Sequence, residues 1–227
     1  QRVLESTGSD QPPPPPDPGR LLSAAEARTV LQHLQSTTLS KWTPAANDPV
    51  SAPVGIRPQR CQSRFAQDHQ AGLASRKSAD ETRTYVVPAT EIPPAGVKLV
   101  LSLTSYPDPA AAAAALDIWR IETQQCATFS ITDPQAGAAR AVTMTAGETL
   151  DEPYPTRMYT LTSTQRNGKT TTVATVAAGL ILADHNLIGV TVTYLHYAPA
   201  TATDADIIRI AESHCRTALL AAFAALQ

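Results

Sequence analysis

The sequence predicts an α+β fold, in which an antiparallel meander sheet of about six to seven strands packs with helices. Three observations lead to this prediction. Residues 106–126 and 205–226 have helical periodicity, and each follows a residue that favours a helix start. Several segments rich in Val and Thr alternate apolar and polar residues, as strands do. Tight turns join some of these segments, so consecutive strands are expected to pair antiparallel.

The helix expected at residues 106–126 has the clearest start in the chain. Asp108 is a good N-cap, because its side-chain oxygen can accept from the free amides of the first turn. Pro109 follows at the first helical position, where its missing amide costs nothing. The alanine run after it has the highest helix propensity. One apolar stripe is expected along this scaffold helix: Ala112, Leu116, Trp119 and Cys126.

Two more helices are expected, one near each end of the chain. In residues 21–34, Ser23 and Glu26 form the S-x-x-E pattern of a capping box. Residues 205–226 form a long C-terminal helix whose apolar residues recur at spacings of three and four. The buried seam of that helix is expected to consist of Ile208, Ala211, Cys215, Leu219, Ala222 and Leu226.

Strand patterns recur along the middle of the chain. The clearest alternation begins at Val97, where every second residue is apolar up to Leu103. Asn167-Gly168 is a strong hairpin signal, and residues 184–186 mark a second turn. The expected strands are residues 82–87, 97–106, 127–132, 140–145, 158–164, 170–182 and 188–194.

Composition divides the chain of 227 residues into a short linker and one domain. Residues 1–20 contain Q-P-P-P-P-P-D-P-G, which favours extended polyproline II and predicts a stiff spacer rather than a proline-rich recognition site. Residues 21–227 are long enough to bury a core and form the α+β domain.

Charge and hydropathy restrict the partners. The 18 Lys and Arg residues nearly balance 20 Asp and Glu residues, which argues against nucleic acid as the main partner. No segment reaches the ~18 consecutive apolar residues of a membrane span. We therefore expect membrane attachment only through an anchor upstream of Gln1.

The residues that carry chemistry do not form a recognisable catalytic motif. The N-G-K-T sequence at 167–170 resembles the end of a phosphate-binding loop, but Ser163 stands where the first glycine belongs. The five His residues never occur at metal-ligand spacing. His214 adjoins Cys215, yet neighbouring helix residues point about 100° apart. The sequence therefore predicts no enzyme, no metal and no cofactor.

A ligand cleft is the best remaining prediction for a site. Arg157 and Tyr159 alternate on one strand and share a face, as do Tyr194 and His196 on another. Aromatic rings with a few polar groups suit a small-molecule pocket. The alternative is that both tyrosines are core residues with the hydroxyl at the rim.

Three cysteines, Cys61, Cys126 and Cys215, are far apart in the sequence. Either all three are reduced, or one pair is bridged and one thiol is left over. Cys61 lies in the long irregular stretch 35–80, which a disulfide could hold to the domain. Cys215, on the apolar seam of the last helix, behaves as a small buried hydrophobe.

Taken in order, these elements resemble the PknH-like extracellular sensor domain of actinobacteria, which occurs on receptor Ser/Thr kinases and on stand-alone envelope lipoproteins. The matching features, over about residues 21–227, are a proline-flanked Cys61, a strand ending in Ser105-Tyr106-Pro107, an Ala-rich helix that ends at Cys126, Thr/Val hairpins and an amphipathic terminal helix. The resemblance implies an antiparallel sheet flanked by helices and a cleft for an external ligand. It also implies two disulfides.

Of the two implied disulfides, one maps to Cys61–Cys126, and the second has no pair because only Cys215 remains. That departure favours a divergent stand-alone lipoprotein or secreted relative over a kinase receptor's own sensor. The resemblance thus implies a non-catalytic, extracytoplasmic domain that senses a ligand or signal in the cell envelope. Its partner would be a small molecule or an envelope protein. Two alternatives are an accessory lipoprotein subunit that docks on a membrane complex, and a hydrolase with a dispersed site.

Overall fold

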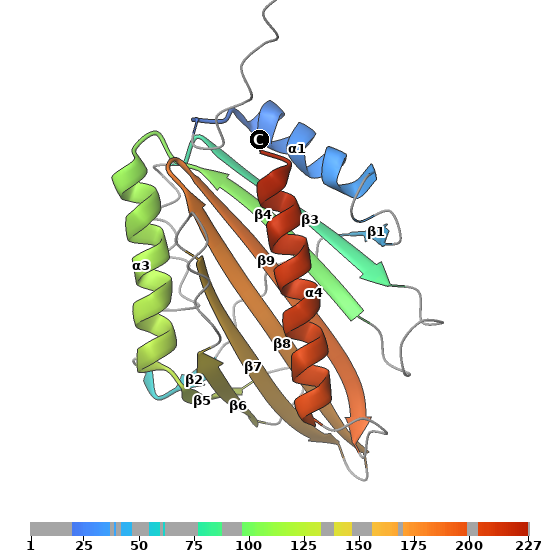
Figure 1. Ribbon diagram of the computed structural model, residues 1–227. Helices are drawn as coiled ribbons and strands as arrows, with labels where there is room; N and C mark the ends of the chain where they lie inside the picture. Colours follow the sequence, from blue (N-terminus) through green and yellow to red (C-terminus); the bar gives the residue numbers. More distant parts are fainter. Residues whose placement is uncertain are drawn as a thin grey trace, which may run out of the picture.

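The computed structural model describes eleven parts of the chain and assigns one sheet with three helices to them (Figure 1). The described residues are 20–36, 39, 42–46, 55–59, 61, 77–87, 97–132, 139–146, 156–167, 170–198 and 204–226. The helices are α1 (Ala24–Ser36), α3 (Pro109–Gln125) and α4 (Asp204–Ala224). The strands are β1 (Thr43–Ala45), β2 (Gly55–Arg57), β3 (Ala79–Val87), β4 (Val97–Ser105), β5 (Thr128–Thr132), β6 (Ala139–Ala146), β7 (Thr156–Asn167), β8 (Thr170–Ala183) and β9 (Asn186–Ala198).

The sheet is antiparallel and has the strand order β1-β3-β4-β9-β8-β7-β6-β5-β2. Strands β5 to β9 form a continuous meander, and the β3–β4 pair joins it at β9. Helix α3 carries the chain from β4, near the middle of the sheet, to β5 near its far edge. The α+β class, the antiparallel sheet and the long C-terminal helix are therefore confirmed. The short edge strands β1 and β2 were not predicted, because three residues carry too little pattern.

Helices α1 and α4 cover one face of the sheet, which we call the α4 face (Figure 1). Strand β4 presents Leu99, Leu101 and Leu103 to this face, and all three are fully buried. Strand β9 adds Val190 and Val192, which pair with Leu101 and Leu99 and point to the same face. These apolar side chains alternate with partly exposed residues, so the predicted period of two is confirmed.

Helix α3 packs on the opposite face, which we call the α3 face. Ile181 belongs to the α4-face core, while the next residue, Leu182, packs against Ala111 and Ala112 of α3. Successive residues of a strand point to opposite faces. The sheet is thus the middle of three layers, with helices on both sides.

The predicted helix starts are confirmed. Asp108 Oδ1 accepts from the amide of Ala110 at 2.9 Å, as an N-cap does. At α1, the Ser23 amide donates to Glu26 Oε2 at 2.9 Å, and the Glu26 amide donates to Ser23 Oγ at 3.4 Å. These two bonds are the reciprocal pair of a capping box. Hydrogen bonds from Ser23 and from Arg20 lower the pKa of Glu26 to about 2.

Some local predictions need correction or fall outside the described residues. On α4, Ile207 is buried and Ile208 only partly so, because the seam passes through the neighbouring position. The β7–β8 hairpin forms with Asn167 paired to Thr170, although its turn residues lie outside the described part. The Trp119 side chain and the linker 1–19 also lie outside it.

Helix α4 lies close to β8 at Gly179, where an added Cβ atom would be crowded by side chains. A Cβ atom at Gly179 would lie 3.0 Å from Leu219 Cδ2 and 3.3 Å from Met158 Cγ. Contacts below 3.4 Å require the neighbours to move. The close approach of α4 to the sheet therefore depends on a missing side chain.

Substitution Gly179→Ala is expected to lower the free energy of unfolding by about 1–3 kcal/mol, since the added methyl overpacks the core. Urea unfolding followed by circular dichroism measures this change. The double variant Gly179→Ala/Leu219→Val should lose less stability than the sum of the losses in the two single variants, because the smaller side chain at position 219 leaves room for the added methyl group. Additivity within about 0.5 kcal/mol would contradict the proposed contact.

Candidate functional site

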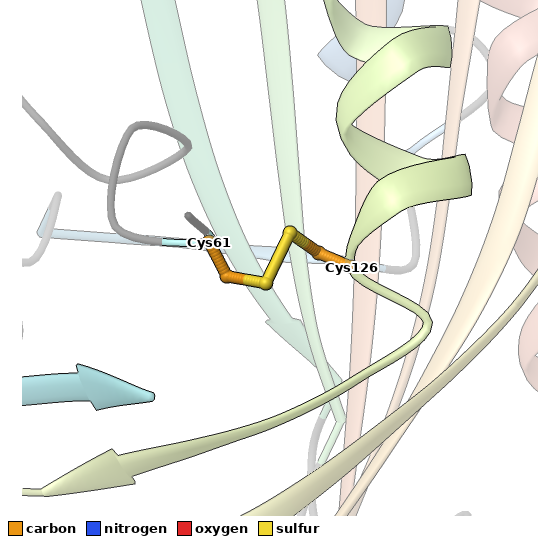
Figure 2. The surroundings of a disulfide bond; sticks show 2 residues. All are labelled: Cys61 and Cys126. Carbon is orange, nitrogen blue, oxygen red and sulfur yellow. A yellow bond between two sulfur atoms is a disulfide. The ribbon is translucent and has the colours of Figure 1, made fainter. Parts of the chain in front are cut away.

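A disulfide joins Cys61 to Cys126, at the point where α3 ends and the chain turns into β5 (Figure 2). Their Cα atoms are 5.6 Å apart, and both side chains are buried. Strand β2, just before Cys61, pairs with β5, so the same segment is also held by backbone hydrogen bonds. The pairing implied by the family resemblance is confirmed.

The disulfide lies in a small apolar cluster on the α3 face. The cluster contains Ile56, Phe129, Ala178 and Tyr159. Tyr159 is thus a buried neighbour of the bridge, as the core alternative predicted. Arg157, two residues away on the same strand, is half-buried, and its guanidinium donates to the carbonyl of Thr156 at 3.1 Å. These two predicted site residues therefore share a face, as expected.

A second group of polar and aromatic side chains lies on the α4 face, where β9, α4 and the segment after α1 meet. Tyr194 Oη and His214 Nδ1 are 2.6 Å apart. The rings of Trp42 and His214 form a T-shaped pair, with centroids 6.2 Å apart. Three elements distant in sequence thus supply one imidazole and two aromatic rings. We call Trp42, Tyr194 and His214 the aromatic triad.

Burial sets the charge state of the aromatic triad. It raises the pKa of Tyr194 to about 12 and lowers the pKa of His214. At neutral pH the phenol therefore keeps its proton and the imidazole is uncharged. When the His214 proton is on Nε2, the Tyr194 hydroxyl donates to Nδ1 and leaves Nε2–H as a donor. This arrangement offers a polar ligand one hydrogen-bonding group.

One more buried polar group lies beside the aromatic triad. Thr175 is paired with Tyr194 in the β8–β9 ladder and is 1% exposed. Its hydroxyl has no hydrogen-bond partner among the described residues. A buried hydroxyl without a partner costs about 1–3 kcal/mol, so a water or a ligand group would be favourable there.

The two tyrosines predicted to line one ligand cleft lie on opposite faces of the sheet. Tyr159 contacts the disulfide cluster on the α3 face, whereas Tyr194 belongs to the core on the α4 face. The side chain of His196 lies outside the described part. The two tyrosines therefore do not face a common cleft, and ligand binding at Arg157, Tyr159, Tyr194 or His196 stays a prediction.

Sequence reasoning missed Trp42 and the partner role of His214. Trp42 is in a segment without periodicity, and its contact with α4 depends on the tertiary fold. Cys215, next to His214, is fully buried, and burial raises its thiol pKa to about 12. A thiol in this state is a poor nucleophile. The interpretation of Cys215 as a buried hydrophobe is confirmed.

Within the described ranges, no group of three or more His, Cys, Asp or Glu side chains could hold a metal ion. Across the same ranges, none of the helices combines the length and apolar character needed to span a membrane. Glu212 of α4 accepts from the Thr160 hydroxyl at 2.7 Å, which ties that carboxylate to β7.

Comparison with known proteins finds a structural likeness only. No protein-family model matches the sequence, and no curated protein matches it. The structure is similar to the crystal structure of the extracellular domain of PknH from Mycobacterium tuberculosis, with a TM-score of 0.57 and 13% sequence identity. The match covers 90% of this chain and 98% of that domain. The two proteins share a fold and are distantly related in structure.

Removal of the disulfide is expected to destabilise the domain strongly. The bridge spans 65 residues of sequence, for which the chain-entropy model gives about 4 kcal/mol. Chemical unfolding of the Cys61→Ala/Cys126→Ala variant measures the loss.

A thiol count on unfolded, unreduced wild-type protein should find one free thiol, Cys215, and none in the Cys215→Ala variant. A count of three in the wild type would contradict the bridge.

His214 is expected to make stability depend on pH. Its pKa is lower in the folded state than its ordinary value of 6.5, so the unfolded chain binds more protons. Stability should therefore be full above about pH 6.5 and fall as the pH drops below it. Urea unfolding between about pH 5 and pH 7 measures the slope, which His214→Gln should reduce. Equal slopes in the wild type and in His214→Gln would exclude His214 as the cause.

Proposed function

We propose that this chain is a non-catalytic, extracytoplasmic domain that senses a ligand or signal in the cell envelope, as a lipoprotein or a secreted protein. The observation that carries the proposal is the shared fold with the extracellular domain of PknH over nearly its whole length. Fold alone does not determine function. The proposal therefore also draws on the disulfide and on the polar groups of the two faces.

The disulfide supports an extracytoplasmic location. Disulfides form and persist in oxidising compartments and are rare in the cytosol. Cys61 and Cys126 are both buried, and the bridge holds Cys61 at the end of α3. A bridge worth about 4 kcal/mol is large against a typical total stability of ~5–15 kcal/mol. The fold would therefore be much weaker in a reducing compartment.

The aromatic triad is the better of the two ligand sites. His214 and Trp42 are both partly exposed, so a molecule can reach them from solvent. The Nε2 atom of His214 offers a donor, and Trp42 offers a flat apolar wall. This chemistry suits a small organic molecule with an oxygen acceptor beside a ring or chain. Tyr159, by contrast, is enclosed by the disulfide cluster.

The second function to consider is an accessory subunit that docks on a membrane protein complex. Ile210 and Leu220 of α4 support it, because their side chains are 41% and 43% exposed. Exposed apolar residues can mark a contact surface, although single ones are common on any protein. The sensing proposal is favoured because the structural likeness that supports it covers 90% of the chain, whereas the docking proposal rests on two exposed side chains.

Native mass spectrometry of protein purified from its source organism tests the proposal. A retained small molecule supports sensing, and a retained protein supports the accessory-subunit role. Wild-type protein is compared with Tyr194→Phe and with Tyr159→Phe, which alter opposite faces by the same chemical change. We expect the small-molecule adduct to weaken roughly tenfold in Tyr194→Phe, since His214 loses the partner that orients it. It should persist in Tyr159→Phe.

The opposite pattern would place the ligand on the α3 face, with Arg157 as its polar contact. An adduct unaffected by either change would exclude both sites. Circular dichroism of each variant checks that the fold is retained, so that a lost adduct is not mistaken for unfolding.

A further inference from the structure

The chain enters α1 through a short segment, residues 20–22, whose backbone is held by three side chains. Asn186 Nδ2 donates to the carbonyl oxygen of Arg20 at 2.8 Å. The amide of Leu22 donates to Ser105 Oγ at 3.0 Å, and Ser78 Oγ donates to the carbonyl oxygen of Leu22 at 3.1 Å. All three partners are distant from this segment in the sequence. We call Ser78, Ser105 and Asn186 the N-terminal clamp.

The clamp is built by the register of the sheet. Ser105 is the last residue of β4, where it pairs with Asn186 on one side and with Ala79 on the other. Ser78 comes immediately before Ala79, and its amide donates to the Ser105 carbonyl at 2.8 Å. The single proton of its hydroxyl is shared between the carbonyl oxygens of Leu22 and Ser105, at 3.1 and 3.0 Å. Three neighbouring strand ends thus present one row of hydrogen-bonding groups. Ser105 and Asn186 are 0% exposed, so these groups are shielded from water.

The clamp holds its segment by non-covalent contacts, whereas a covalent bond ties the opposite side of the domain. It holds the segment by three hydrogen bonds and the buried Leu22 side chain, and each such bond is worth only about 0.5–1.5 kcal/mol net. Helix α1 has 13 residues, a length that is marginal for an isolated helix in water. The opposite side of the domain is tied covalently by Cys61–Cys126.

We propose that the N-terminal clamp binds residues 20–22 of its own chain reversibly. When these hydrogen bonds open, α1 leaves the sheet as a unit. The remaining strands and α4 stay folded in the released state. The occupant of the clamp is this chain's own segment. The part of the proposal that concerns signalling rests on the proposed function, because there the clamp would set whether the segment before α1 is coupled to the sensing fold.

Local contacts explain why α1 would move as one body. The capping box between Ser23 and Glu26 is internal to the helix start, and the Arg20–Glu26 ion pair at 2.6 Å joins residues that move together. Release therefore leaves these contacts intact. The contacts that break are those of the clamp, the packing of Ala27, Leu31 and Leu34 in the main core, the hydrogen bond from the Tyr85 hydroxyl to the Leu31 carbonyl at 3.5 Å, and the Arg28–Glu81 ion pair. Opening such a unit costs less than unfolding the whole domain.

Hydrogen exchange of the full chain, followed by mass spectrometry, tests the proposal. In Ser105→Ala the Leu22 amide loses its acceptor, so α1 is released more often. A released α1 is marginal as an isolated helix, so its own hydrogen bonds then open, and its amides should exchange at least roughly tenfold faster than in the wild type. Amides of β8, β9 and α4 should keep their wild-type rates. The matched control is Ser102→Ala on the same strand, whose hydroxyl points to Gly189 at 3.4 Å and does not touch residues 20–22.

Two results would overturn the proposal. One is wild-type α1 exchanging as slowly as β8 and α4, which would make the helix part of a single cooperative unit. The other is a uniform increase across all elements in Ser105→Ala. If that variant does not fold, Ser78→Ala, which removes one hydroxyl at the sheet end, provides the same comparison. No ligand enters this measurement, so its failure is distinct from a failure of the sensing proposal.

Discussion

The pairing of β4 with β9 is the interaction on which the rest of the structure depends. It joins the β3–β4 pair to the five-stranded meander and runs from Val97–Tyr194 to Ser105–Asn186. The register decides which side chains face α1 and α4, because a shift of one residue would exchange the two faces. It also decides which polar groups meet at the end of the sheet. The core, the aromatic triad and the N-terminal clamp all follow from this one ladder.

The sheet also explains why residues predicted to line one cleft lie on opposite faces. Alternation along a strand groups residues on one face, but it does not show which face of one strand matches that of another. Arg157 and Tyr159 lie on one face of β7, and Tyr194 lies on the other face two strands away. Only the pairing of β7 with β8 and of β8 with β9 relates these faces. The sequence indicated both hairpin turns but not the exact register of each pair, and a shift of one residue would reverse which faces match.

The predictable parts of the fold are those that local chemistry determines. The Asp108 cap, the capping box at Ser23 and the alternation after Val97 are each specified by a few adjacent residues, and each was correct. The unpredictable parts need tertiary context. Trp42 has no periodic neighbours, yet it contacts His214 on another element. The Cys61–Cys126 pair followed from family resemblance, since three cysteines alone allow several states.

Helix α3 connects the N-terminal clamp at one end of the domain with the Cys61–Cys126 disulfide at the other. It begins next to the clamp, where Tyr106 follows Ser105 and exchanges backbone and side-chain hydrogen bonds with His185 of the β8–β9 turn. It ends at Cys126, in a covalent bond that thermal motion does not open. The hydrogen bonds of the clamp, by contrast, are non-covalent and can open when α1 is released. A domain with one permanent and one reversible tie can open at one side without losing its fold, and this asymmetry is what a switchable N-terminal segment requires.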